Sequence, residues 1–177
     1  NYTGAGTVEF LIDKHKKIYF LEMNTRLQVE HPITEMVTGI DLVKEQIRVE
    51  AGEELSFTQE NIQSAGHAIE CRIYAEDGFN NFTPSTGILT DIYFPSGLGV
   101  RMDEGVRTGQ EITPYYDPLL GKLITWGYDR QTALQRMIRA LGEFHIAGIE
   151  SSIPFCLMVF RHKTFQDGKY STHTLDA

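Results

Sequence analysis

Two short runs of alternating side chains near the start of the chain place the strongest constraint on its fold. Residues 7–12 (TVEFLI) and 18–24 (IYFLEMN) are rich in β-branched and aromatic residues, and a polar turn separates them. This pattern predicts an antiparallel hairpin with a symmetric turn centred on His15 and Lys16. The turn sets the register, and a slip of one residue would move every side chain to the opposite face.

In this register the hairpin has one apolar face and one mixed face. The apolar face contains these facing pairs: Val8 with Met23, Phe10 with Leu21, and Ile12 with Tyr19. The mixed face contains the other pairs: Thr7 with Asn24, Glu9 with Glu22, and Leu11 with Phe20. We therefore expect two carboxylates to oppose each other directly.

Carboxylates that oppose each other on a hairpin repel, at a cost of about 0.5 kcal/mol. A cation between Glu9 and Glu22 would remove this cost, and magnesium prefers carboxylate and amide oxygens. Asn24 follows on the same face and can supply a third oxygen. Alternatively, solvent and the turn lysines screen the two carboxylates. Because Leu11 and Phe20 share this face, it is not simply a solvated one, and the pattern favours a bound metal.

A second polar cluster follows the hairpin directly. Arg26, Gln28 and Glu30 alternate, so an extended segment would project all three side chains to one side. Arg26 can hold a small planar anion by two parallel hydrogen bonds, and Glu30 can accept a proton. A structural salt bridge between Arg26 and Glu30 is the alternative. A metal pair, an anion clamp and a base in one short segment form a more specific pattern than any one of them.

The rest of the chain predicts alternating helices and strands. The expected elements are a helix from Asp41 to Val49, strands at 67–74, 88–93, 99–103 and 121–126, a loop at 77–87, a helix from Asp129 to Gly142, and a helix from Ser152 to about 162. Arg72 lies beside Glu70 on the strand at 67–74. From spacing alone, an ordinary ion pair is the expected role of Arg72.

Composition excludes several classes of protein. The chain has 24 Asp and Glu residues against 16 Lys and Arg residues. This net charge of −8 argues against a nucleic-acid-binding protein, because such proteins bind phosphates through clustered cations. No apolar run approaches the roughly 20 residues of a membrane helix. Cys71 and Cys156 are far apart in sequence, which indicates neither a zinc site nor a disulfide scaffold and favours a reducing compartment. The chain starts at Asn1 without Met, so we expect a piece of a longer protein.

The run EMNTRLQVEHPITEM at 22–36 closely resembles the biotin carboxylase family, the ATP-grasp component of acetyl-CoA, propionyl-CoA and pyruvate carboxylases. The resemblance continues through GAGTVEFL, DLVKEQIRVEAGE, AIECRIYAED, FTPSTG, PYYDPLLGKLI and GIESSIPF. It implies an α+β fold. Residues 1–65 would be the C-terminal part of the ATP-grasp domain, with an antiparallel sheet and flanking helices. Residues 66–177 would form the small antiparallel-sheet biotin carboxylase C-terminal domain.

The resemblance also implies ligands for a metal and a nucleotide. Glu9, Glu22 and Asn24 match the ligands of the family's divalent metal, Mg²⁺ or Mn²⁺. Leu11 and Leu21 match hydrophobic contacts to the base of ATP. Strict alternation puts Leu21 on the face opposite Leu11, and a β-bulge between them would reconcile the two assignments.

The remaining implied site residues handle bicarbonate and biotin. Arg26, Gln28 and the backbone of Val29 match the bicarbonate-binding groups, and Glu30 matches the base that deprotonates bicarbonate. Arg72 matches the arginine that stabilises the biotin enolate, a different role from the ion pair expected on spacing.

The implied reaction is an ATP-dependent ligation. Bicarbonate attacks the γ-phosphoryl group of ATP to give carboxyphosphate, which breaks down to carbon dioxide and phosphate. Phosphate then deprotonates biotin, and carboxybiotin forms. Because the family's glycine-rich lid and phosphate-holding lysines are not in these 177 residues, we expect the chain alone to be inactive. Two alternatives remain, a non-catalytic folded or dimerisation module and another carboxylate-activating ATP-grasp ligase. The RLQVEH and ECR runs argue against the second.

The resemblance implies protein partners as well. They are a biotin carboxyl carrier domain, a carboxyltransferase, and a second copy of the chain that binds near Leu98 and Arg101. The final acceptor, whether acetyl-CoA for fatty acid biosynthesis, propionyl-CoA or pyruvate, belongs to the carboxyltransferase. The compartment is the bacterial cytoplasm or the mitochondrial matrix.

Overall fold

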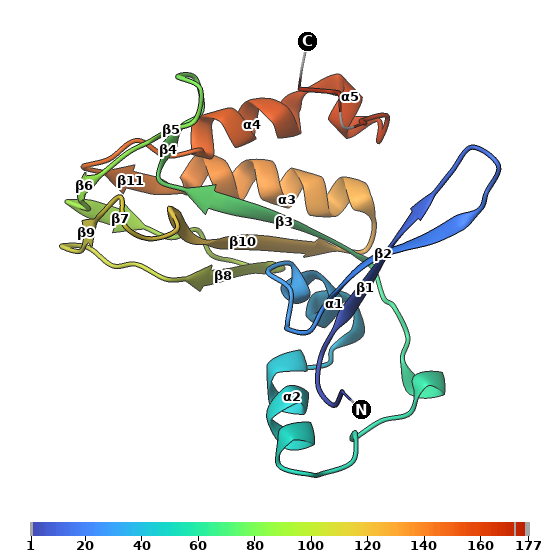
Figure 1. The fold of residues 1–177 in the computed structure, drawn as a ribbon. Coiled ribbons are helices and arrows are strands. Elements are labelled where there is room, and N and C mark those ends of the chain that lie inside the picture. Colours follow the sequence, from blue (N-terminus) through green and yellow to red (C-terminus); the bar gives the residue numbers. More distant parts are fainter. Residues whose placement is uncertain (1, 172, 176–177) are drawn as a thin grey trace. The chain divides into compact units, whose positions relative to one another are not determined.

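The computed structural model describes residues 2–171 and 173–175, and Figure 1 shows the path of the chain. Contacts between residues divide the chain into two compact units, residues 1–65 and residues 66–177. Both units combine helices with antiparallel strands, as expected for an α+β chain. Within the described residues, no helix is both long enough and apolar enough to cross a membrane.

The first unit contains a hairpin, two α-helices and one turn of 3-10 helix. Its elements are β1 (Thr7–Ile12), β2 (Ile18–Asn24), α1 (His31–Thr38), α2 (Leu42–Glu50) and η1 (Gln59–Asn61). Helix α2 starts where the sequence predicts, because the Asp41 carboxylate accepts a hydrogen bond of 2.8 Å from the backbone N–H of Lys44. Helix α1 ends at Gly39, whose φ of 73° is a conformation that glycine adopts at no steric cost.

The hairpin keeps the predicted register only in the half that is far from its turn. The pairs found as predicted are Thr7–Asn24, Val8–Met23 and Glu9–Glu22. The pairs nearer the turn are Phe10–Phe20, Leu11–Tyr19 and Ile12–Ile18. The predicted pairs in that half were wrong: Phe10–Leu21, Ile12–Tyr19 and Leu11–Phe20. The rings of Phe10 and Phe20 pack edge to face with centroids 6.2 Å apart, which confirms that they share a face.

The turn explains this shift, because residues 13–17 form it and their number is odd. The Asp13 carboxylate accepts hydrogen bonds from the backbone N–H groups of His15 (2.8 Å) and Lys17 (2.9 Å). Its backbone N–H donates to the Lys17 carbonyl at 3.0 Å. The turn is therefore centred on His15 itself, and the surplus residue, Leu21, is accommodated as a β-bulge in β2.

The second unit is built on a three-stranded antiparallel sheet in the order β3–β10–β8. Its strands are β3 (His67–Tyr74), β10 (Leu119–Gly127) and β8 (Val100–Glu104). Helix α3 (Arg130–Glu143) packs on β10 and β3, and α4 (Ile153–Arg161) packs on α3 and β3 (Figure 1). This unit is therefore a small antiparallel sheet packed by two helices that follow it in sequence.

Short strand pairs and a short helix complete this unit. They are β4 (Glu76–Asp77) with β5 (Thr83–Pro84), β6 (Gly87–Ile88) with β9 (Glu111–Ile112), β7 (Asp91–Tyr93) with β11 (His145–Ala147), and α5 (Lys163–Gln166). The single strand predicted at 88–93 is broken because the chain changes partners there. The backbone N–H of Leu89 donates to Gln110, and that of Thr90 donates to Ala147, both at 2.9 Å.

Buried hydrophobic side chains gather in the second unit. Those that are essentially inaccessible include Ile73, Leu123, Leu134, Met137 and Leu141. The buried residues of α3 recur at helical spacing and form one apolar stripe. The helix nevertheless continues to Glu143 rather than closing at Gly142, which does not take a left-handed conformation.

The hairpin of the first unit contrasts with this core. All residues of β1 are exposed, as are all residues of β2 except Asn24, and Phe20 retains 65% of its accessible surface. A two-stranded hairpin is at best marginally stable in water without a hydrophobic face to cover it. The exposed apolar surface of β1 and β2 is thus what a sheet presents when further strands or helices are to pack on it.

Candidate functional site

The structure brings together the three side chains predicted to hold a metal. The Asn24 amide nitrogen donates to Glu9 Oε1 at 3.0 Å and to Glu22 Oε1 at 3.2 Å. Glu9 and Glu22 face each other across the hairpin, in the half where the predicted register holds. The amide N–H groups therefore occupy the position between the carboxylates, where a positive charge would be stabilised.

This donor set fits a divalent cation. Magnesium is commonly bound through one or two carboxylates together with substrate phosphates, and it retains several waters. Among the described residues there is no cluster of three or more His, Cys, Asp and Glu side chains that could hold a metal. The Asn24 amide is a candidate third ligand, and a half-turn of that amide would exchange its nitrogen for its oxygen.

The bulge in β2 bears on the two leucines assigned to the nucleotide base, which strict alternation would place on opposite faces of the hairpin. Leu11 pairs with Tyr19 and, by alternation along β1, shares the face of Glu9. Leu21 is the surplus residue, so strict alternation no longer assigns it to the opposite face. Phe20, which we expected beside the carboxylates, instead lies on the other face with Phe10.

The segment after the hairpin is not extended, so this premise of the sequence analysis was wrong. It bends at Arg26 and turns at residues 29–30. The backbone N–H of His31 donates to the Gln28 carbonyl at 3.2 Å, and the His31 Nδ1 atom lies 2.9 Å from the same oxygen. Pro32 in the first turn of α1 favours this early helix start, because proline has no N–H to satisfy and a helical φ.

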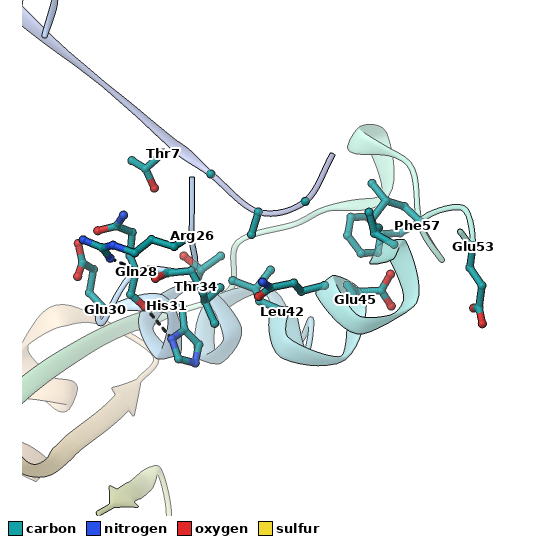
Figure 2. A pocket seen from close by; sticks show the side chains of 17 residues that line it. Thr7, Arg26, Gln28, Glu30, His31, Thr34, Leu42, Glu45, Glu53 and Phe57 are labelled. Carbon is teal, nitrogen blue, oxygen red and sulfur yellow. Dashed lines mark hydrogen bonds between the residues drawn. The ribbon is translucent and has the colours of Figure 1, made fainter. Parts of the chain in front are cut away.

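Arg26, Gln28 and Glu30 nevertheless line a single cavity of about 690 Å³. Figure 2 shows the three side chains next to one another on the turn that precedes α1. The other walls are residues 4–7 and residues of α1, α2 and the loop after α2, among them Thr34, Leu42, Val49, Leu55 and Phe57. Val29 lies in the turn between Gln28 and Glu30, which both line the cavity.

Gln28 lines this cavity and carries a buried polar group. Its Nε2 atom has almost no accessible surface and no hydrogen-bond partner within the protein. A buried donor without a partner costs about 1–3 kcal/mol, so such groups are rare unless a ligand satisfies them. Arg26 donates one hydrogen bond, from Nη1 to the Leu27 carbonyl at 3.3 Å, and a guanidinium has five N–H donors in all. The cavity is therefore rich in donors, as a site for a small anion requires.

A buried carboxylate fixes the opposite wall of the cavity. Glu45 accepts hydrogen bonds from Ser56 Oγ (2.7 Å), from the Ser56 backbone N–H (3.2 Å) and from Arg48 Nη1 (3.3 Å). The Ser56 hydroxyl is the largest cause that lowers the pKa of Glu45, and Arg48 adds to it. These contacts tie the loop after α2 to the helix. Sequence reasoning missed this wall, because only the fold brings Ser56 back to Glu45.

Arg72 belongs to the second unit, where it lies on β3 opposite Lys122 of β10. Its Nε atom lies 3.8 Å from Glu70 Oε1, so the ion pair expected from spacing is present. The Glu70 side chain is 6% exposed and that of Arg72 41% exposed. The Arg72 guanidinium is thus partly accessible at the surface of the sheet, next to a buried carboxylate.

Comparisons with known proteins agree with this geometry. A family model described as the biotin carboxylase C-terminal domain matches residues 70–177, which is more than half of the chain. The chain belongs to the biotin carboxylase family. Residues 1–58 match a second family model, the ATP binding domain of the carbamoyl-phosphate synthase L chain. This second match covers the hairpin and the cavity.

Relatives in the biotin carboxylase family are similar along the whole chain. Biotin carboxylase 1 of Bacillus subtilis is 54% identical over 176 residues, which cover 99% of this chain and 39% of that protein. The biotin carboxylase of a Nostoc species is 54% identical over 172 residues, which cover 97% of this chain and 38% of that protein. The chain thus spans well under half of the length of these biotin carboxylase relatives.

Solved biotin carboxylase structures share the fold. One is the biotin carboxylase domain dimer of the 2-oxoglutarate carboxylase of Hydrogenobacter thermophilus, in complex with MgADP, ADP and bicarbonate. It has a TM-score of 0.93 and 48% identity, covering 98% of this chain and 38% of that chain. The biotin carboxylase component of a pyruvate carboxylase has a TM-score of 0.92 and 47% identity, covering 98% and 38%. The predicted α+β fold and family are both confirmed.

Proposed function

We propose that this chain is the part of a biotin carboxylase that binds bicarbonate, the metal and biotin. In this proposal the longer protein uses ATP to carboxylate biotin on a carrier domain. The observation that carries the proposal is that Arg26, Gln28 and Glu30 line one cavity, in which Gln28 also has a buried Nε2 atom with no partner in the protein. The hydrogen bonds that join Asn24 to Glu9 and Glu22 support a metal site directly before this cavity in the chain.

Bicarbonate is the proposed ligand of the cavity. It is a small planar anion, so the Arg26 guanidinium can donate two parallel hydrogen bonds to two of its oxygens. Gln28 Nε2 would donate to bicarbonate and so satisfy its own desolvated N–H groups. Glu30 would take the proton of bicarbonate, which leaves an oxygen nucleophile for the γ-phosphoryl group. The products of that attack are carboxyphosphate and ADP, and carboxyphosphate then breaks down to carbon dioxide and phosphate.

Glu9, Glu22 and Asn24 would hold Mg²⁺, or Mn²⁺, together with the phosphates of ATP. A cation in this position neutralises charge on the phosphoryl group that is transferred. Leu11 and the bulged Leu21 are proposed to contact the base of the nucleotide. The similar 2-oxoglutarate carboxylase domain, solved with MgADP and bicarbonate, supports this assignment of ligands.

Arg72 is proposed to stabilise the biotin enolate. Phosphate released from carboxyphosphate would take the proton from the ureido nitrogen of biotin, which leaves negative charge on the ureido oxygen. A guanidinium held in place before the reaction stabilises such an oxyanion at little reorganisation cost. The contact of Glu70 with Arg72 at 3.8 Å would supply that fixed position.

The partners and the compartment are also proposals. A second copy of the chain is the proposed partner at Leu98, whose side chain is 84% exposed, and at Arg101, which makes two hydrogen bonds to Asp103. The similar domain from Hydrogenobacter thermophilus is a dimer. A biotin carboxyl carrier domain and a carboxyltransferase complete the reaction. Relatives include a Bacillus subtilis protein and a mouse mitochondrial carboxylase, which supports the bacterial cytoplasm or the mitochondrial matrix.

Binding of isotope-labelled bicarbonate, followed by broadening of its NMR signal, tests the proposal directly. We expect the chain to broaden the signal, and the Arg26→Met variant to lose most of the effect. Arg161→Met, an exposed arginine in the second unit, is the matched control and should behave as the unaltered chain does. If the unaltered chain and Arg26→Met gave the same signal, the cavity would not be a bicarbonate site. The chain would then be better described as a non-catalytic folded module.

A further inference from the structure

His31 joins the turn that carries Gln28 and Glu30 to the start of helix α1. The backbone N–H of His31 closes this turn by donating to the Gln28 carbonyl at 3.2 Å. Glu30, the third residue of the turn, has φ −81° and ψ 9°, which is the conformation of that position in a type I turn. Two of the side chains that line the cavity are therefore directed by the conformation of this one turn.

The start of α1 lacks two of the usual sources of stability. Glu30 occupies the N-cap position, but its side chain makes no capping hydrogen bond. His31 precedes Pro32, and a residue before proline is disfavoured in the helical conformation. Helix α1 nevertheless begins at His31. A side-chain contact that holds this turn would therefore stabilise both the helix start and the direction of the residues before it.

The imidazole of His31 makes such a contact. Its Nδ1 atom lies 2.9 Å from the Gln28 carbonyl oxygen, the same oxygen that closes the turn (Figure 2). A carbonyl oxygen can only accept a hydrogen bond, so Nδ1 carries the proton in this contact. The His31 side chain is 13% exposed, so few water molecules can compete for the bond. One carbonyl is thus held twice by the same residue, through its backbone and through its ring.

The second ring nitrogen of His31 faces a different group. Its Nε2 atom lies 3.9 Å from Glu35 Oε2, which is longer than a hydrogen bond. The other oxygen of Glu35, Oε1, accepts a hydrogen bond of 2.8 Å from the backbone N–H of Leu42, the first residue of α2. Glu35 thus ties α1 to α2, whereas the shorter contact, through Nδ1, ties the ring to the turn. The two ring nitrogens therefore have separable parts.

We propose that His31 is a positioning residue for the anion site, and that its Nδ1–H group holds the Gln28 carbonyl so that Gln28 and Glu30 line the cavity together. The inference rests on the proposed function, in which Gln28 donates to bicarbonate and Glu30 accepts its proton. His31 is not assigned to the ligand itself. A rotation of the turn would redirect both side chains at once, and the reaction requires both within hydrogen-bond reach of one anion.

The tautomer of His31 tests this inference without any ligand. Long-range proton–nitrogen NMR correlation locates the ring proton above about pH 8, where an ordinary imidazole is neutral. We expect the His31 ring to be protonated at Nδ1, and the absence of its signals from the His31→Asn variant assigns them. A His31 ring protonated mainly at Nε2 would overturn the proposal, whatever the chain binds.

Two amide variants separate the parts of the two ring nitrogens. The amide nitrogen of asparagine is as many bonds from Cβ as Nδ1 of histidine, and that of glutamine as many as Nε2. We therefore expect His31→Asn to bind labelled bicarbonate as the unaltered chain does. His31→Gln should bind it at least about fivefold more weakly, which is the loss of one ordinary hydrogen bond. His15→Gln, at an exposed position in the hairpin turn, is the control and should bind normally.

Equal binding by His31→Asn and His31→Gln, with both folded by circular dichroism, would overturn the positioning role, because a residue that only fills space would not distinguish them. If the unaltered chain bound no bicarbonate, the proposed function would fail on its own. The side-chain amide signals of Gln28 would then decide the inference together with the tautomer. They should keep their chemical shifts in His31→Asn and move in His31→Gln, and the opposite result would overturn it. The tautomer measurement stands even if a variant fails to fold.

Discussion

The Asn24 side-chain nitrogen lies 3.0 Å from Glu9 Oε1 and so places partial positive charge against a carboxylate. The same nitrogen also reaches Glu22 at 3.2 Å. The amide therefore relieves the repulsion between two opposed carboxylates when no cation lies between them. A cation at the proposed site would displace these N–H groups, because N–H groups and a metal ion cannot share the position. In that proposal Asn24 changes its hydrogen bonds, and a turn of the amide would present its oxygen to the cation.

The first prediction concerns magnesium-dependent binding of ADP. Replacing Glu9→Gln together with Glu22→Gln removes both negative ligands, so we expect at least about a tenfold loss in affinity, which corresponds to about 1.4 kcal/mol. Calorimetric titration of the chain with ADP, with and without magnesium, measures this. Glu111→Gln, an exposed carboxylate in the second unit, is the control and should bind as the unaltered chain does. If the double variant still bound ADP in a magnesium-dependent way, the hairpin carboxylates would not be the metal ligands.

The second prediction is that Gln28→Leu raises the stability of the chain but weakens its binding of bicarbonate. The substitution removes a buried donor that has no partner, so we expect the free energy of unfolding to rise by about 1 kcal/mol. The same change should weaken bicarbonate binding, because the cavity loses a donor to the anion. Urea denaturation and the NMR titration together measure the two effects. Gln63→Leu, at an exposed position of the same unit, should change neither, and a destabilised Gln28→Leu variant would contradict this explanation.

The hairpin shows how far local pattern can predict structure. Alternation correctly paired Glu9 with Glu22 and Thr7 with Asn24, and these pairs contain the three residues of the proposed metal site. It failed nearer the turn, because the Asp13 carboxylate closes a turn with an odd number of residues. Such side-chain-to-backbone hydrogen bonds compete with a symmetric turn, and periodicity alone does not predict them.

The cavity shows the limit of periodicity more clearly. Arg26, Gln28 and Glu30 do share a cavity, but a turn brings them together rather than an extended strand. The resemblance to a family predicted the grouping, since it does not depend on the local conformation. The contact of Ser56 with Glu45 depends on packing between residues that are 11 positions apart. No pattern within a short window of sequence could predict it.

The third prediction is that the stability of the chain depends on pH through the ionisation of Glu45. Hydrogen bonds from Ser56 lower the pKa of Glu45 in the folded chain below its ordinary value of 4.5. The ionised carboxylate therefore stabilises the fold above that value, and the contribution is lost as pH falls through the lower, folded pKa. Ser56→Ala should reduce this loss, so the difference in stability between the two chains should shrink on acidification. Urea denaturation across this range measures it, and a difference independent of pH would contradict the role of Glu45.

The last prediction concerns local stability in the hairpin. The side chains of β1 and nearly all of those of β2 are exposed, whereas β3 and β10 pack against α3 in a buried core. Opening of the hairpin therefore exposes little additional apolar surface and should cost little free energy. We expect amide hydrogens of residues 7–12 and 18–24 to exchange at least about tenfold faster than those of β3 and β10. Hydrogen exchange followed by mass spectrometry measures this. Slow exchange in the hairpin of this chain would contradict the view that its apolar surface is uncovered. In that case the hairpin amides of a full-length relative would exchange no more slowly than those of this chain.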